Sequence, residues 1–221
     1  MLIIIPAYNE EENIADVIKG AIKYLPAAKI LVVDDGSTDA TGTIARNMGA
    51  VVITHPRNLG VGAALRRGYI YAIENHFDRI LQIDGDGQHD PKYLPLLLRE
   101  LANADVVIGS RFLPGSFAYP IPLCRRIGML LFSFIARKKT GISLTDTTSG
   151  YRAYSRRAVR WCLCGDWEYP DANLLVWLAK SGMAVAETPV RMYANRQGKS
   201  FHVGMEPIYY VYKMLLNLGR G

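Results

Sequence analysis

The sequence predicts an α/β fold, with a mostly parallel sheet and flanking helices. Two observations support this prediction. Short apolar runs rich in Ile, Leu and Val alternate with amphipathic stretches of helical spacing over the first 110 residues. Strands that alternate with helices are joined by right-handed crossovers, which make the sheet mostly parallel. The chain has 221 residues, 50% of them hydrophobic, enough for one large domain with a sizeable core.

The expected elements follow in chain order. Buried strands are expected at residues 2–5, 30–33, 51–53, 80–83 and 105–108, and a later strand at 184–190 carries Pro189, a residue typical of sheet edges. Helices are expected at residues 11–24, after Asp39, and at 59–72, 93–101, 125–139, 172–179 and 207–218. Asn9 or a neighbour is expected to cap the first helix. Residues 147–152 are expected to form a polar loop.

The net charge of +6 is unevenly distributed. Residues 111–160 hold ten Lys and Arg but one acidic residue, Asp146, whereas residues 1–110 hold ten Lys and Arg and fourteen Asp and Glu. Such a basic block favours phosphate, anionic lipid or nucleic acid as a partner, unless it is only a solvated surface. Nucleic acid is the weakest of these, because Phe132 and Phe134 lie in an apolar run and are not interleaved with cations.

The sequence predicts a cytoplasmic protein. Its three cysteines form no even disulfide framework, and the chain begins almost directly with a strand instead of a signal peptide. No apolar stretch reaches the ~18 residues of a transmembrane helix. Residues 125–139 combine an apolar centre with basic ends, which fits either a core helix or a helix lying in a membrane interface.

A carboxylate pair follows the strand at residues 80–83. Ligands of open α/β sheets bind beyond the carboxyl ends of the strands, which is where Asp84, Gly85 and Asp86 lie. Alternate residues of an extended segment point to the same side, so both carboxylates can converge on one ion. Oxygen ligands with room for water and substrate phosphates suit Mg²⁺ or Mn²⁺. The alternative is a Gly-rich surface turn, in which Asp is also common.

A second glycine motif, Gly60-Val61-Gly62, does not predict a nicotinamide site. It follows the third expected strand instead of the first, and the usual third glycine and acidic residue are missing. We expect these glycines to allow a close approach of a helix start to a ligand or strand.

Four motifs occur in order along the first half: Pro-Ala-Tyr-Asn-Glu at 6–10, Val-Asp-Asp-Gly-Ser-Thr-Asp at 33–39, Asp-Gly-Asp-Gly-Gln-His at 84–89 and Gly-Ser-Arg at 109–111. With them the chain resembles glycosyltransferase family 2, whose members are inverting enzymes of the A-type fold. Residues 148–154 and the loop 196–200 resemble the branch that transfers sugars to polyprenyl phosphates and includes the dolichyl-phosphate mannosyltransferases. The loop 196–200 is one residue shorter before its glycine than is usual in that branch.

The resemblance implies roles for named residues. It assigns residues 1–111 to a half that binds nucleotide-sugar and metal, and 112–221 to an acceptor half of the same domain. It implies a UDP- or GDP-sugar donor, bound by Pro6, Ala7, Tyr8, Glu10, Val33, Asp35, Asp84, Gly85, Arg111, Arg196 and Lys199. It also implies a Mg²⁺ or Mn²⁺ ion held by Asp84, Asp86 and Gln88 against the donor diphosphate, where a cation stabilises the leaving group. Arg111, and Arg196 or Lys199, are expected to clamp phosphates.

The sequence leaves two kinds of acceptor open. A saccharide or other hydroxyl acceptor needs a general base, for which Asp171 and Glu168 are the candidates, although Asp171 would equally cap the helix at 172–179. A polyprenyl phosphate is already ionised near pH 7 and needs cations instead, which the basic block favours. The catalytic residues are then expected to be Asp86, Arg111 and, for a hydroxyl acceptor, Asp171.

Two rival functions remain for the same fold. A sugar-nucleotide-forming nucleotidyltransferase is disfavoured, because the turn after the first strand carries no cation. A nucleotide-sugar binding module without catalysis is disfavoured by the intact set of Asp84, Asp86 and Gln88.

Overall fold

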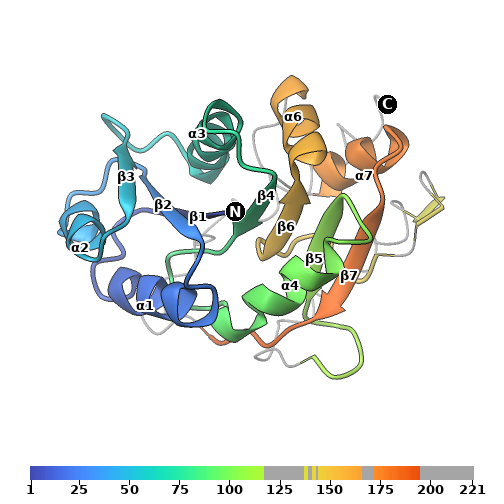
Figure 1. Ribbon diagram of the computed structural model, residues 1–221, viewed down its shortest axis with the longest axis horizontal. Helices are drawn as coiled ribbons and strands as arrows, with labels where there is room; N and C mark the ends of the chain where they lie inside the picture. The colour runs from blue at the N-terminus through green and yellow to red at the C-terminus, as the bar shows by residue number, and fades with distance from the viewer. Residues whose placement is uncertain (117–136, 139–140, 143, 166–171, 195–221) are drawn as a thin grey trace, which may run out of the picture.

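Seven strands form one sheet in the computed structural model, which describes residues 1–116, 137–138, 141–142, 144–165 and 172–194 (Figure 1). The strand order is β3-β2-β1-β4-β6-β5-β7. In chain order the strands are β1 (Leu2–Ala7), β2 (Lys29–Asp34), β3 (Val51–Thr54), β4 (Arg79–Gln82), β5 (Val106–Ser110), β6 (Arg152–Ser155) and β7 (Val185–Pro189).

The sheet is parallel apart from β6, so the predicted fold class is confirmed. β6 runs antiparallel to both of its neighbours, and Ala153 is paired with Leu81 of β4 on one side and Val107 of β5 on the other. Arg152 was expected in a polar loop, and this strand was not predicted from the sequence. As a result β4 and β5, which are consecutive in the chain, are not neighbours in the sheet.

Helices cover both faces of the sheet. The helices are α1 (Ile14–Tyr24), α2 (Thr41–Asn47), α3 (Val61–Glu74), α4 (Leu94–Glu100), preceded by the 3₁₀ turn η1 (Pro91–Tyr93), α6 (Arg156–Cys164) and α7 (Ala172–Lys180). In Figure 1, α3, α6 and α7 lie on one side of the sheet, and α1 and α4 lie on the other.

The core is divided into two clusters by the sheet. Leu2 and Ile4 of β1 belong to the cluster under α3, α6 and α7, whereas Ile3 and Ile5 belong to the cluster under α1, α2 and α4. All four are 0% exposed. Burial on both faces explains why this strand is a continuous apolar run instead of an alternating one.

Several element ends differ from those expected. The first helix begins at Ile14, and Asn9 does not cap it. Asn9 has a φ of 55°, and its Oδ1 accepts a hydrogen bond of 2.9 Å from the backbone N–H of Thr38, which joins the loops after β1 and β2. Pro189 is the last residue of β7, and β7 is an edge strand of the described sheet, as a proline in this strand predicted.

Two expected helices lie largely or wholly outside the described residues, namely 125–139 and 207–218. Across the residues that the structure describes, no helix combines the length and apolarity needed to cross a bilayer.

Candidate active site

The predicted site residues gather at one edge of the sheet. Asp35 directly follows β2, Asp84 lies just beyond β4, and Arg111 directly follows β5. Because these strands are parallel, their carboxyl ends meet on the same side. Arg152 begins the antiparallel strand β6 and is paired with Gln82 near the end of β4, so the second half of the chain also reaches this edge.

Gln88 supports Asp86 in the loop after β4. The Asp86 carboxylate accepts two hydrogen bonds from Gln88, one of 3.0 Å from the backbone N–H and one of 2.8 Å from the side-chain amide. Gly87, between them, has a φ of 73°, which favours glycine. The structure thus places Gln88 as the residue that orients Asp86, in addition to its expected role as a ligand.

His89 supports Asp84 from the other end of the same loop. Its Nδ1 accepts a hydrogen bond of 3.2 Å from the backbone N–H of Asp84, and its ring stacks on Tyr151 with 4.8 Å between centroids. Burial lowers the pKa of His89 to about 4, so the ring is neutral and can act as this acceptor. In the sequence, His89 stood out only as part of the motif at 84–89.

Three carboxyl groups at this edge have raised pKa values. Loss of water contact raises the pKa of Asp84 to about 6, against the opposing charges of Arg152 and Arg111. Burial and the neighbouring charge of Asp84 raise the pKa of Asp86. Burial, together with the charges of Asp86, Asp39 and Asp84, raises the pKa of Glu10 to about 7, although a hydrogen bond from Asn13 opposes the shift. The protein therefore gathers three carboxyl groups here whose charged forms are disfavoured mainly by burial.

This donor set fits a divalent cation. Within the described part of the chain, no three His, Cys, Asp or Glu side chains gather closely enough to hold a metal by themselves. Mg²⁺ usually takes only one or two carboxylates and completes its shell with water and substrate phosphates. A cation between Asp84 and Asp86 would also offset the repulsion that raises the pKa of Asp86.

The end of β1 packs directly against this loop. The backbone N–H of Gly85 donates to the carbonyl of Pro6 at 3.2 Å, and a Cβ on Gly85 would lie 3.1 Å from the Cβ of Ala7. Glycine at 85 thus allows the close approach of the two strand ends. Tyr8 is half-buried just beyond β1.

Asp35 organises the loop after β3. Its carboxylate lies 2.7 Å from His55 Nδ1 and accepts hydrogen bonds from the backbone N–H groups of Leu59 and Gly60 at 3.0 and 2.7 Å. Val33, predicted to contact the substrate, lies in β2 just before Asp34. Its side chain is 0% exposed and belongs to the core cluster under α3.

Arg111 is held by an ion pair that the sequence analysis did not foresee. Its Nε and Nη2 each donate to the Asp146 carboxylate at 2.7 Å, and its backbone N–H donates to the same group at 3.0 Å. The two side chains are 6% and 0% exposed. In the sequence, Asp146 stands out only as the single acidic residue of the basic block at 111–160. This isolation was the signal that could have pointed to the ion pair.

Glu187 of β7 positions the loop that carries Asp146. Its carboxylate accepts hydrogen bonds of 2.7 Å from the backbone N–H groups of both Thr145 and Asp146. Burial raises the pKa of Glu187. Arg111 is thereby fixed through Asp146 to the edge strand of the sheet, while its charge still acts on Asp84.

Arg152 and Gly150 complete the site from the second half. Arg152 is 0% exposed and donates to the backbone carbonyls of Ser149 and Thr147 at 2.7 and 3.1 Å. A Cβ on Gly150 would lie 2.9 Å from Asp84 Oδ2, so the loop 147–150 closes directly over that carboxylate. Both residues belong to the motif at 148–154, and this motif was what pointed to them in the sequence.

Four expected site residues lie outside the described residues. They are the candidate bases Glu168 and Asp171 and the candidate phosphate ligands Arg196 and Lys199.

Glycosyltransferases are among the known proteins that this chain is similar to. Two similar proteins are undecaprenyl-phosphate mannosyltransferase of Micrococcus luteus, 32% identical over 90% of this chain and 86% of the relative, and polyprenol monophosphomannose synthase of Mycolicibacterium smegmatis, 31% identical over 90% and 79%. A similar solved structure is glucosyl-3-phosphoglycerate synthase of Mycobacterium tuberculosis with Mn²⁺, uridine diphosphate and glucosyl-3-phosphoglycerate bound. It has a TM-score of 0.72 and 22% identity over 99% of this chain and 79% of that one, which shows a shared fold.

The family model described as "Glycosyl transferase family 2" matches residues 2–162, which include the Asp84–Asp86 pair, Arg111 and Arg152. The chain therefore belongs to glycosyltransferase family 2.

Proposed function

We propose that the protein is an inverting, metal-dependent glycosyltransferase that transfers a sugar from a nucleoside-diphosphate sugar to a polyprenyl phosphate. The observation that carries the proposal is the Asp84–Asp86 pair, set at the carboxyl end of β4 beside the ends of β1 and β2. The two relatives named for undecaprenyl-phosphate and polyprenol acceptors support the acceptor class.

The donor would lie across the ends of β1, β2 and β4. A bound Mg²⁺ or Mn²⁺ would supply positive charge to the diphosphate as it leaves. Asp84 and Asp86 would hold this ion, and Gln88 keeps Asp86 oriented through two hydrogen bonds. Tyr8 and Glu10 follow β1 in the sequence and would contact the nucleoside there.

The acceptor would need cations more than a base. A phosphate monoester has a second pKa of about 6, so it is largely ionised at neutral pH and can attack the anomeric carbon without losing a proton. Arg111 supplies one fixed charge near Asp84, and Arg196 and Lys199 are the sequence candidates for further phosphate contacts. Because a polyprenyl phosphate resides in a bilayer, the protein would act peripherally at the cytosolic membrane face.

The direct test is transfer from labelled UDP- and GDP-sugars in the presence of Mn²⁺ or Mg²⁺ and undecaprenyl or dolichyl phosphate in detergent. We expect a labelled glycolipid, and its loss when EDTA removes the metal. Transfer to a soluble saccharide without glycolipid formation would replace this proposal by the hydroxyl-acceptor function, with Asp171 or Glu168 as base. Nucleotide-sugar binding with no transfer to either acceptor would indicate a binding module.

Asp86→Ala provides the catalytic control. Its side chain lies in a loop beyond β4 and outside both core clusters, so the variant should stay folded by circular dichroism and lose turnover. A variant that retains wild-type turnover would show that Asp86 does not hold the metal.

A further inference from the structure

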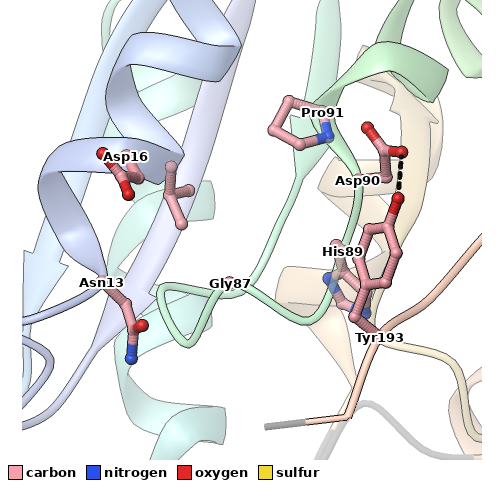
Figure 2. A pocket seen from close by; sticks show the side chains of 8 residues that line it. Asn13, Asp16, Gly87, His89, Asp90, Pro91 and Tyr193 are labelled. Atoms are coloured by element: carbon pink, nitrogen blue, oxygen red, sulfur yellow. Dashed lines mark hydrogen bonds between the residues drawn. The ribbon is translucent and has the colours of Figure 1, made fainter. Parts of the chain in front are cut away.

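The segment after β7 crosses the loop after β4 and binds it through one backbone bridge and one side chain. The backbone N–H of Tyr193 donates to the carbonyl of Gln88 at 2.8 Å. Met192 and His89 form an isolated antiparallel bridge, and the Tyr193 hydroxyl donates to Asp90 Oδ2 at 3.1 Å. Figure 2 shows the Tyr193 hydroxyl on the Asp90 carboxylate. We refer to residues 191–193 as the clasp.

The same part of the loop is also held by Tyr151, the residue directly before β6. The hydroxyl of Tyr151 donates to the backbone carbonyl of Asp90 at 3.0 Å, and its ring stacks on His89. Residues 88–90 are therefore bound from two sides, by Tyr151 and by the clasp. Asp86 and Gly87, which precede them, depend on the hydrogen bonds of Gln88 for their position.

The side of the loop that faces α1 lacks comparable packing. A cavity separates the loop from α1 and is lined by Asn13, Asp16, Val17 and Gly87, among others (Figure 2). A Cβ on Gly87 would meet nothing nearer than Asn13 Oδ1 at 3.7 Å. Because this side offers room for movement, the clasp is a main restraint on where Gln88, and with it Asp86, lies.

We propose that Tyr193 is a positioning residue for the metal-binding loop. It fixes Gln88 through its backbone and Asp90 through its hydroxyl, and Gln88 in turn orients Asp86. The clasp continues in the sequence to residues 195–200, which carry Arg196 and Lys199. Tyr193 thus ties the carboxylates expected to hold the cation to the segment expected to bind phosphate. This inference rests on the proposed function.

A purely structural role for Tyr193 predicts that Mn²⁺ affinity falls only together with the melting temperature. A positioning role predicts that the affinity falls by itself. The residue is 42% exposed, and its hydroxyl bonds to a carboxylate at the surface of the loop. Loss of that hydroxyl should leave the melting temperature nearly unchanged. An effect on metal affinity without an effect on folding is therefore the signature of positioning.

The test compares the full-length wild type with Tyr193→Phe and with Tyr24→Phe, a matched control in the last turn of α1 whose tyrosine is 37% exposed. Mn²⁺ affinity is measured from the free-ion signal in electron paramagnetic resonance, with Mn²⁺ alone and with UDP or GDP added. We expect Tyr193→Phe to bind Mn²⁺ about 3- to 10-fold more weakly, the size expected for the loss of one ordinary, partly exposed hydrogen bond. Its kcat at saturating Mn²⁺ should be retained.

Wild-type Mn²⁺ affinity in Tyr193→Phe would overturn the inference, as would an equal loss in Tyr24→Phe or a loss that only parallels a lower melting temperature. The wild type itself separates this failure from that of the proposed function. If it binds no Mn²⁺ with either nucleotide, the proposed metal-dependent transferase is wrong and the inference falls with it.

Discussion

The ion pair between Arg111 and Asp146 should make a large contribution to stability when only one partner is removed. Both side chains are almost fully buried, and three hydrogen bonds from Arg111 converge on the Asp146 carboxylate. Asp146→Asn preserves the shape of the side chain but leaves the guanidinium charge without its counter-charge. Loss of one partner from a buried pair typically costs about 3–5 kcal/mol.

A second ion pair provides the matched control for Asp146→Asn. Asp78 lies 3.6 Å from Arg156 and is 82% exposed, so Asp78→Asn should cost about 0–1 kcal/mol. Urea denaturation followed by circular dichroism gives both free energies of unfolding, provided that the slopes with denaturant agree. The double variant Arg111→Met with Asp146→Asn should recover part of the loss, because it removes the stranded charge.

The reasoning would be refuted if Asp146→Asn and Asp78→Asn destabilised the protein equally. It would also be refuted if the double variant were less stable than Asp146→Asn alone. Either result would mean that Arg111 keeps water or another counter-charge close by, and that Asp146 is not the residue that fixes it.

Further predictions concern the site and the helix next to it. Gly150→Ala should lower transfer activity at least several-fold with little change in melting temperature, because the added Cβ would lie 2.9 Å from Asp84 Oδ2. Glu10→Gln should stabilise the metal-free protein at pH 8 but hardly at pH 5, as measured by urea denaturation. Burial raises the pKa of Glu10 from 4.5 to about 7, so the wild type loses stability as the pH rises between these values, by up to about 3 kcal/mol at 1.36 kcal/mol per pKa unit. Arg66→Ala should cost about 1 kcal/mol in the same measurement, because Arg66 donates to the carbonyls of Leu163 and Gly165 at the end of α6.

Four of the strands that the sequence predicted, β1, β2, β4 and β5, are largely buried, whereas β3 and β7, which were also predicted, are only partly buried. In β1 and β2 nearly every residue is apolar and buried, so local composition suffices to identify them. The sequence also placed Asp35, Asp84, Asp86 and Arg111 at one sheet edge, because a strand end is a local feature and parallel strands bring their ends together.

The missed features depend on contacts between distant residues. β6 contains Arg152, a residue atypical of a buried strand, and its burial is accommodated by the carbonyls of Thr147 and Ser149. The partner of Arg111 lies 35 residues along the chain, and that of Tyr193 lies 103 residues back. No periodicity or short motif encodes such pairings.

The position of β6 has a consequence for where the chain can be divided. The strand that leads to Asp84 and Asp86 is flanked by β1 on one side and by β6, which comes from beyond residue 150, on the other. A fragment that stops after Arg111 would expose the edge of β4 and separate it from β5, while the complementary fragment would lose both neighbours of β6. The boundary expected between donor and acceptor halves is thus not a boundary of the fold. Split reporters or domain exchanges cut at that point should give two insoluble pieces, whereas exchanges that keep β6 with β4 and β5 preserve the sheet.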